Sequence, residues 1–92
     1  MTDTENMVFA RIKSVVLSLE DRIGPIDSDA IRPEEWIVDL GLDSLTVTEI
    51  QTEIEAVFGI MIGFDELDEV TTWLSLTRLV IAKQSAVTAT LR

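Results

Sequence analysis

The chain has 92 residues, of which 47% are hydrophobic, so it holds enough apolar material for one compact domain and too little length for two. A formal net charge of −10 argues against nucleic acid and anionic membrane surfaces, because both need a positive face, and favours a protein partner with a basic patch. Cysteine and histidine are absent, which excludes a disulfide framework, an intrinsic thiol nucleophile and the usual neutral-pH base.

The first predicted element is a helix over about residues 5–22, ended by Gly24-Pro25. Apolar residues recur along it at helical spacing: Val8, Ile12, Val15, Val16, Leu19 and Ile23. The polar, acidic start of the chain does not resemble a signal peptide, and no apolar run has the length of a membrane span. We therefore expect a cytoplasmic monomer.

Residues 24–42 form a long connection, which we predict to be a packed loop with one short helical turn after Pro33. The loop carries its own apolar anchors: Ile26, Ile31, Trp36, Ile37, Leu40 and Leu42.

A second helix is expected to begin at Asp43 or Ser44 and to end at Phe58, before Gly59. Its buried stripe is expected to contain Val47, Ile50, Ile54, Val57 and Phe58. An extended segment, a short third helix over about 65–69 and a last helix over about 73–83 follow, with the last helix capped by Thr71 or Thr72. The prediction is one all-α domain over residues 1–92, with three main helices and one minor helix, a core over about 5–83 and a flexible tail over 84–92.

The segment Gly41-Leu42-Asp43-Ser44-Leu45 places a serine hydroxyl at the N-terminus of the second helix. The helix dipole and free amides there favour an attached phosphodiester. Asp43 is also a good N-cap, so local sequence alone favours a helix start that has no further function. Its carboxylate repels a phosphate, which suggests a second role, such as contact with a cationic partner or a metal held by one.

The exposed side of the second helix carries an apolar residue, Leu45, among carboxylates. Leu45, Glu49, Thr52 and Ala56 line up at helical spacing, with Glu53 beside them. An exposed leucine ringed by acidic residues is typical of a docking surface.

The run from Asp39 to Leu45 resembles the phosphopantetheine attachment motif of acyl carrier proteins. The resemblance covers roughly residues 8–82 in element order and spacing. Further positions match the family pattern: Trp36 before the motif, Glu49, Ile54 and Phe58 after it, and Ile62, residues 65–69 and Val70-Thr71-Thr72 on the way into the last helix. The resemblance implies a four-helix acyl-carrier-like bundle with a long first loop.

The resemblance further implies a non-enzymatic acyl carrier. A separate phosphopantetheinyl transferase would attach 4'-phosphopantetheine to Ser44, and the thiol of that arm would hold acyl groups as thioesters. The expected partners are that transferase and acyl-transferring or condensing enzymes with basic docking patches, which would recognise Asp43, Leu45, Glu49, Glu53 and Glu55. An acyl pocket is expected at Val47, Ile54, Ile62, Leu67 and Leu76, with residues 65–69 as its lid.

Several positions depart from the fatty-acid branch of the family: Leu42, Thr46, Ala56, Val57 and Gly63-Phe64. They favour polyketide or specialised fatty-acid and lipid biosynthesis over primary fatty-acid synthesis, with a peptide pathway ranked last. Two acidic clusters, one within residues 27–39 and one within residues 65–69, lack the spacing of an EF-hand, so we expect a solvated acidic face rather than a metal site. The alternative function is an unmodified acidic helical adaptor for basic proteins.

Overall fold

The structure is a computed structural model that describes the backbone of residues 1–90 and the side chains of residues 1–86. Its regular elements are α1 (Asp3–Ser18), α2 (Glu20–Ile23), two 3-10 turns (Ser28–Ala30 and Ile37–Leu40), α3 (Ser44–Phe58), α4 (Phe64–Glu69) and α5 (Trp73–Thr90). The described backbone contains no β-strand beyond one isolated bridge between Trp36 and Thr72, which confirms the predicted all-α class.

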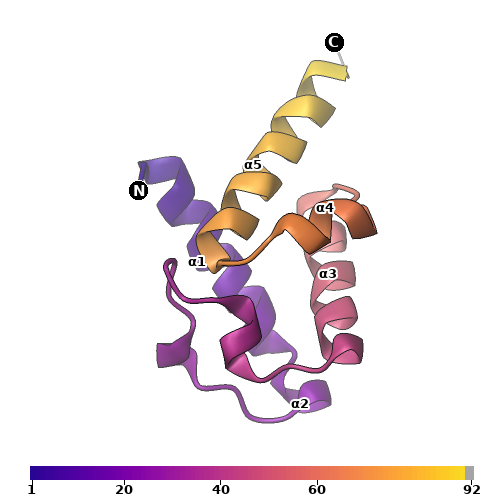
Figure 1. Cartoon of the computed structure of the whole chain (residues 1–92). Helices are drawn as coiled ribbons and strands as arrows, with labels where there is room; N and C mark the ends of the chain where they lie inside the picture. The colour runs from indigo at the N-terminus through magenta and orange to yellow at the C-terminus, as the bar shows by residue number, and fades with distance from the viewer. Residues whose placement is uncertain (91–92) are drawn as a thin grey trace.

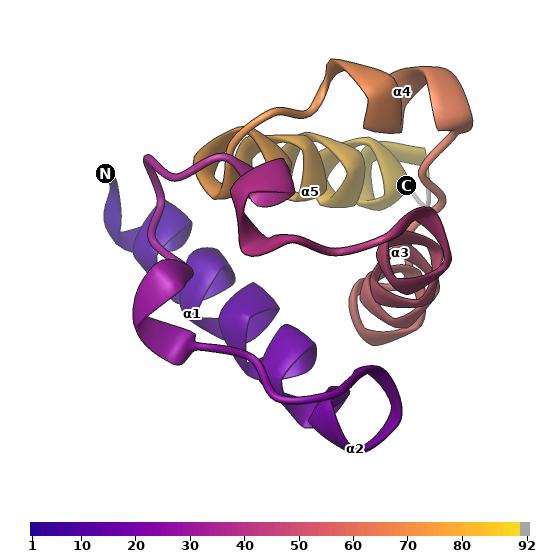
Figure 2. The same cartoon turned by 60° about the horizontal axis from the view of Figure 1, so that its bottom comes forward.

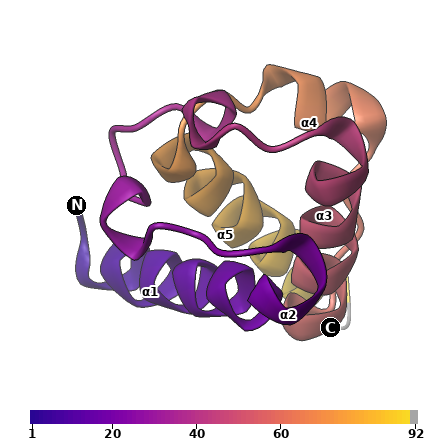
Figure 3. The same cartoon turned by 90° about the horizontal axis from the view of Figure 1, so that it is seen from below.

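The three long helices enclose the core, and α4 lies on the outside between α3 and α5 (Figures 1 and 2). The loop between α2 and α3 crosses the open side of the bundle (Figure 3). Apolar residues from all of these parts except α4 form the buried core: Ile12, Val15, Val16, Leu19, Ile31, Ile50, Ile54, Ile60, Ile62, Trp73, Leu76 and Val80. No helix in residues 1–90 is both long and apolar enough to cross a bilayer.

The predicted single helix over residues 5–22 is two segments. It begins earlier, because Thr2 and Glu5 cap each other: the Glu5 N–H donates to Thr2 Oγ1 at 3.1 Å, and the Thr2 N–H donates to Glu5 Oε1 at 2.8 Å. It breaks at Leu19, where the Ser18 hydroxyl donates to the Val15 carbonyl at 2.6 Å and the Leu19 N–H donates to the Val16 carbonyl at 3.1 Å. The chain therefore tightens there before α2 completes the turn to Gly24.

The loop is held mainly by its backbone, and the prediction that Trp36 anchors it was wrong. The Trp36 side chain is 53% exposed. Instead, the Ile37 N–H donates to the Thr71 carbonyl at 2.9 Å, while the Trp73 N–H donates to the Glu35 carbonyl at 3.2 Å. This pairing of the loop with the start of α5 satisfies amides that a helix N-terminus otherwise leaves unpaired. Ile31 supplies the fully buried apolar anchor.

The predicted end of the last helix at Lys83 was also wrong, because α5 continues to Thr90 and its last turns extend past the ends of α1 and α3 (Figure 1). The part of the predicted tail at residues 91–92 lies outside the described residues. The start of α5 matches the prediction: the Ser75 N–H donates to Thr72 Oγ1 at 3.1 Å, so Thr72 is the cap.

Candidate functional site

The site is the N-terminus of α3, where Ser44 is the first helical residue. Gly41 ends the preceding 3-10 turn with φ 77° and ψ 22°, a left-handed conformation that favours glycine. Asp43 then caps α3, accepting the Thr46 N–H on Oδ1 at 2.8 Å. This hydrogen bond to the Thr46 backbone holds the pKa of the Asp43 carboxyl below its usual range. The cap thus fixes both the helix start and a negative charge beside Ser44.

Ser44 is exposed, and its hydroxyl has no hydrogen-bond partner among the described residues. Among the described residues, the backbone N–H groups of Ser44 and Leu45 donate no hydrogen bond either. An exposed hydroxyl beside free first-turn amides suits a covalently attached phosphodiester, since the amides and the helix dipole both favour negative charge there.

The predicted recognition residues differ in how exposed they are and in whether they bond to other residues of the fold. The Leu45 side chain is 69% exposed, which suits contact with a partner. Glu53 faces solvent in part and lies 3.9 Å from Arg22. Glu49 is half-buried, and its Oε2 is covered without a hydrogen-bond partner among the described residues. Glu55 is engaged within the fold, since its Oε2 accepts the Ile62 N–H at 2.7 Å and so holds the connection between α3 and α4.

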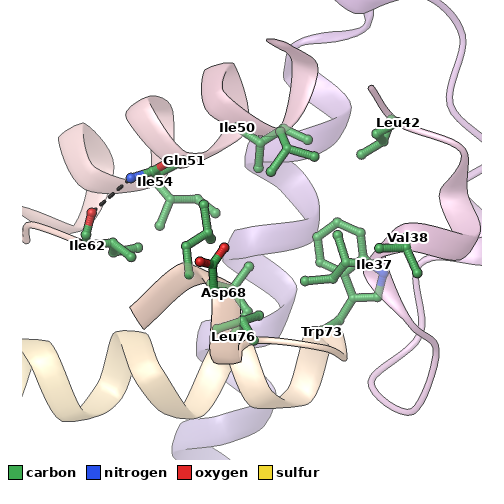
Figure 4. A pocket seen from close by; sticks show the side chains of 13 residues that line it. Ile37, Val38, Leu42, Ile50, Gln51, Ile54, Ile62, Asp68, Trp73 and Leu76 are labelled. Atoms are coloured by element: carbon green, nitrogen blue, oxygen red, sulfur yellow. Dashed lines mark hydrogen bonds between the residues drawn. The ribbon is translucent and has the colours of Figure 1, made fainter. Parts of the chain in front are cut away.

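A cavity of about 290 Å³ lies beside this helix start. All five residues of the predicted pocket line it: Val47, Ile54, Ile62, Leu67 and Leu76. Leu42 lines it as well, so lining residues lie on either side of Ser44 in the sequence, Leu42 before it and Val47 after it, and the cavity adjoins the helix N-terminus. Figure 4 shows α3, α4, α5 and the loop contributing its walls.

Sequence reasoning missed several lining residues: Ile37, Val38, Ile50, Gln51, Asp68 and Val70. Ile37 and Val38 become wall residues only because the loop pairs with the start of α5, a long-range contact with no local signal. Gln51 did carry a signal, because it is a polar residue between Ile50 and Ile54 on the apolar side of α3. Trp73 is both fully buried and part of the lining.

Comparison with known proteins agrees with this geometry. A family model described as "Phosphopantetheine attachment site" matches residues 11–80. Pseudomonine synthase PmsE from Pseudomonas entomophila is 42% identical over 60 residues, which is 65% of this chain and 10% of that protein. An acyl carrier protein from Thermotoga maritima is 26% identical over 65 residues, which is 71% of this chain and 76% of that protein. The chain thus spans about a tenth of the synthase and most of the acyl carrier protein.

Proposed function

Because the chain belongs to the phosphopantetheine-attachment family of carrier proteins, which are not enzymes, we propose that Ser44 carries the family's covalent phosphopantetheine group and that the chain shuttles acyl intermediates. The observation that carries this proposal is the exposed, unbonded Ser44 hydroxyl at the first position of α3, inside the matched region. When bound, the group supplies a terminal thiol that holds acyl groups as thioesters, which a chain without cysteine cannot do by itself.

The residues around Ser44 leave activation of its hydroxyl to another protein. The hydroxyl must lose its proton as its oxygen bonds to the phosphorus of coenzyme A, while the pyrophosphate bond of coenzyme A breaks and releases adenosine 3',5'-bisphosphate. The chain has no histidine, and Asp43 Oδ1 is occupied by the Thr46 N–H. We therefore assign the base to the phosphopantetheinyl transferase. Asp43 would serve as the acidic contact for that enzyme or its metal, with its low pKa keeping the contact negative.

The cavity beside α3 is the proposed site for the acyl chain. Its lining is mainly apolar, so burying a hydrocarbon chain there is favourable. Leu42 and Val47 provide the wall nearest Ser44, while Ile54, Ile62 and Leu76 lie further along it. Shielding an acyl chain in this way would keep it from water between partner enzymes.

The proposed docking surface is the exposed side of α3, with Leu45 as the apolar contact and Glu49 and Glu53 as the charged rim. The net charge of −10 supports partners with basic patches. We propose a specialised pathway rather than primary fatty-acid synthesis. The support is Leu42 in the motif and the higher identity to the relative named a pseudomonine synthase than to the general acyl carrier protein. The name of that relative leaves a polyketide, specialised lipid or peptide product open.

The test is incubation of the protein with coenzyme A and a promiscuous phosphopantetheinyl transferase, followed by intact-mass and peptide mass spectrometry. We expect one phosphopantetheinyl group on the wild type, located on Ser44, and none on Ser44→Ala. Ser75→Ala is the matched control and should still be modified. An unmodified wild type would contradict the proposal and favour the acidic adaptor, while modification of Ser44→Ala at another serine would overturn the assignment of the residue.

A further inference from the structure

We propose that the cavity selects oxygen-substituted acyl chains, hydroxyacyl or ketoacyl, over saturated ones, and that Trp73 and Gln51 make the selection. This inference rests on the proposed function, since the chain to be selected is the one attached through Ser44. Two polar atoms of the cavity lining that have no partner among the described residues carry the argument.

The first is the indole nitrogen of Trp73. Its side chain is 0% exposed, and within the described residues Nε1 has no hydrogen-bond partner. An indole nitrogen can only donate, and a buried donor without a partner is rare because it is costly. A phenylalanine would fill much of the same space without this cost. The N–H therefore points to an acceptor that arrives from outside the fold.

The second is the side-chain oxygen of Gln51. Gln51 Nε2 donates to the Ile62 carbonyl at 2.9 Å, which fixes the amide orientation, since the flipped amide would place two acceptors against each other. Oε1 is then the free atom, and it is buried without a partner among the described residues. It can only accept a hydrogen bond, so a hydroxyl group would satisfy it.

The two residues lie at different places along the same cavity (Figure 4). Trp73 is at the end lined by Ile37, Val38 and Leu42, next to the start of α3, while Gln51 is beside Ile62. A chain that enters from Ser44 would pass Trp73 first. A chain oxygen beyond the thioester would accept from the indole N–H, and a hydroxyl further along would donate to Gln51, whereas the hydrocarbon of a saturated chain offers neither bond.

Both polar atoms are covered in the present closed form, so the cavity must widen to bring them into reach. The element best placed to move is α4, which contributes Leu67 and Asp68 to the wall. An ion pair between Glu66 Oε2 and Lys83 Nζ at 2.6 Å connects α4 to α5. Entry of a chain between α4 and the core would uncover the Gln51 oxygen, and displacement of the loop at Ile37 and Val38, which lie beside the indole nitrogen in Figure 4, would uncover the Trp73 N–H. Only an oxygen-bearing chain would restore both hydrogen bonds.

The experiment loads the full chain with hexanoyl, β-oxohexanoyl or 5-hydroxy-3-oxohexanoyl phosphopantetheine from the matching coenzyme A thioesters, with loading checked by intact mass. Nitrogen-15 NMR then follows the two indole N–H groups. The Trp73 proton should exchange with solvent about fivefold more slowly with either oxygen-bearing chain than with hexanoyl, as expected for one added hydrogen bond. Trp36, which is 53% exposed, is the internal control and should not distinguish the three chains.

Two variants complete the test. Trp73→Phe should abolish the difference in melting temperature between the β-oxohexanoyl and hexanoyl forms, and Gln51→Met should abolish the further difference made by the 5-hydroxyl group of the 5-hydroxy-3-oxohexanoyl form. If Trp73→Phe does not fold, the NMR exchange rates of the wild type and the melting temperatures of Gln51→Met still test the selectivity. Failure to load would contradict the proposed function, whereas successful loading with equal Trp73 exchange for all three chains would overturn the selectivity alone.

Discussion

Arg78 Nε donates to Glu5 Oε2 at 2.8 Å and so joins the start of α1 to α5. The other oxygen of the same carboxylate accepts the Thr2 N–H at 2.8 Å. The hydrogen bond from Arg78, followed by the one from the Thr2 backbone, lowers the pKa of Glu5 from 4.5 to about 2. One side chain thus caps α1 and connects two helices that are distant in sequence.

The Glu5–Arg78 contact predicts a specific acid sensitivity. A carboxyl with a lowered folded-state pKa stabilises the fold above its unfolded value and loses that effect as pH falls, here between pH 4.5 and about pH 2. Glu5→Gln and Arg78→Met should both be less stable than wild type at neutral pH and should approach it near pH 2. Urea denaturation across this range measures the effect. Parallel curves for wild type and both variants would contradict the assignment.

Gly41 and Gly59 offer a matched pair that separates stability from function. Both have positive φ, 77° and 67°, and neither has a heavy atom within 4 Å of an added Cβ. Alanine should therefore cost each about 1 kcal/mol through backbone strain alone. Because Gly41 precedes Asp43 and Ser44, only Gly41→Ala should also slow modification by the transferase. Equal modification rates for the two variants would show that the Gly41 conformation is not needed by that enzyme.

Most of the fold could be predicted because its signals are local. The start of α3 at Ser44 follows from Asp43 as a cap, and its end follows from Gly59 in the left-handed conformation. The errors have longer-range causes. Trp36 is exposed because its segment is held by backbone pairing with residues 71–74, and hydrophobicity alone gave no sign of this pairing.

The candidate site likewise contains residues that local sequence signals predict and contacts that only the fold creates. Ser44 and Asp43 were predicted as site residues from a motif, and the five predicted pocket residues share one cavity because each lies on the inward side of its element. Glu55 was predicted to recognise partners, yet its carboxylate accepts the Ile62 N–H. The sequence cannot show such a contact, because it depends on where the chain turns back after Gly59.

Leu45 and Met61 test whether docking belongs to the exposed side of α3 near Ser44. The two side chains are 69% and 79% exposed, so alanine at either position should leave the fold intact. Leu45→Ala should slow acyl transfer by a partner enzyme about fivefold, which corresponds to ~1 kcal/mol of lost contact. Met61→Ala, beyond the far end of α3, should not. Transfer kinetics on the loaded protein measure the difference, and equal slowing by both substitutions would argue against a surface centred on Leu45.

The charge balance predicts that the protein gains stability with salt. The chain has seventeen acidic and seven basic residues, so charge repulsion outweighs attraction in the compact state. The Debye length falls from ~30 Å at 0.01 M salt to ~10 Å at 0.1 M, which screens that repulsion. We expect the melting temperature to rise by roughly 5 °C over this range, equivalent to ~1 kcal/mol for a domain of this size. A flat melting temperature would contradict the prediction.

The same repulsion should loosen α4 first, because four of its six residues are acidic. The ion pair between Lys83 and Glu66 opposes this loosening by holding α4 to α5. Lys83→Met should speed amide exchange in α4 at low salt while leaving the middle of α3 protected. Lys13→Met is the matched control: it removes the same charge, and Lys13 forms no ion pair among the described residues. Hydrogen exchange read by mass spectrometry or NMR distinguishes the two variants. If both raise exchange in α4 equally, net charge rather than the Lys83–Glu66 contact controls this helix, and if neither does, α4 is held by the packing of Leu67 and Val70.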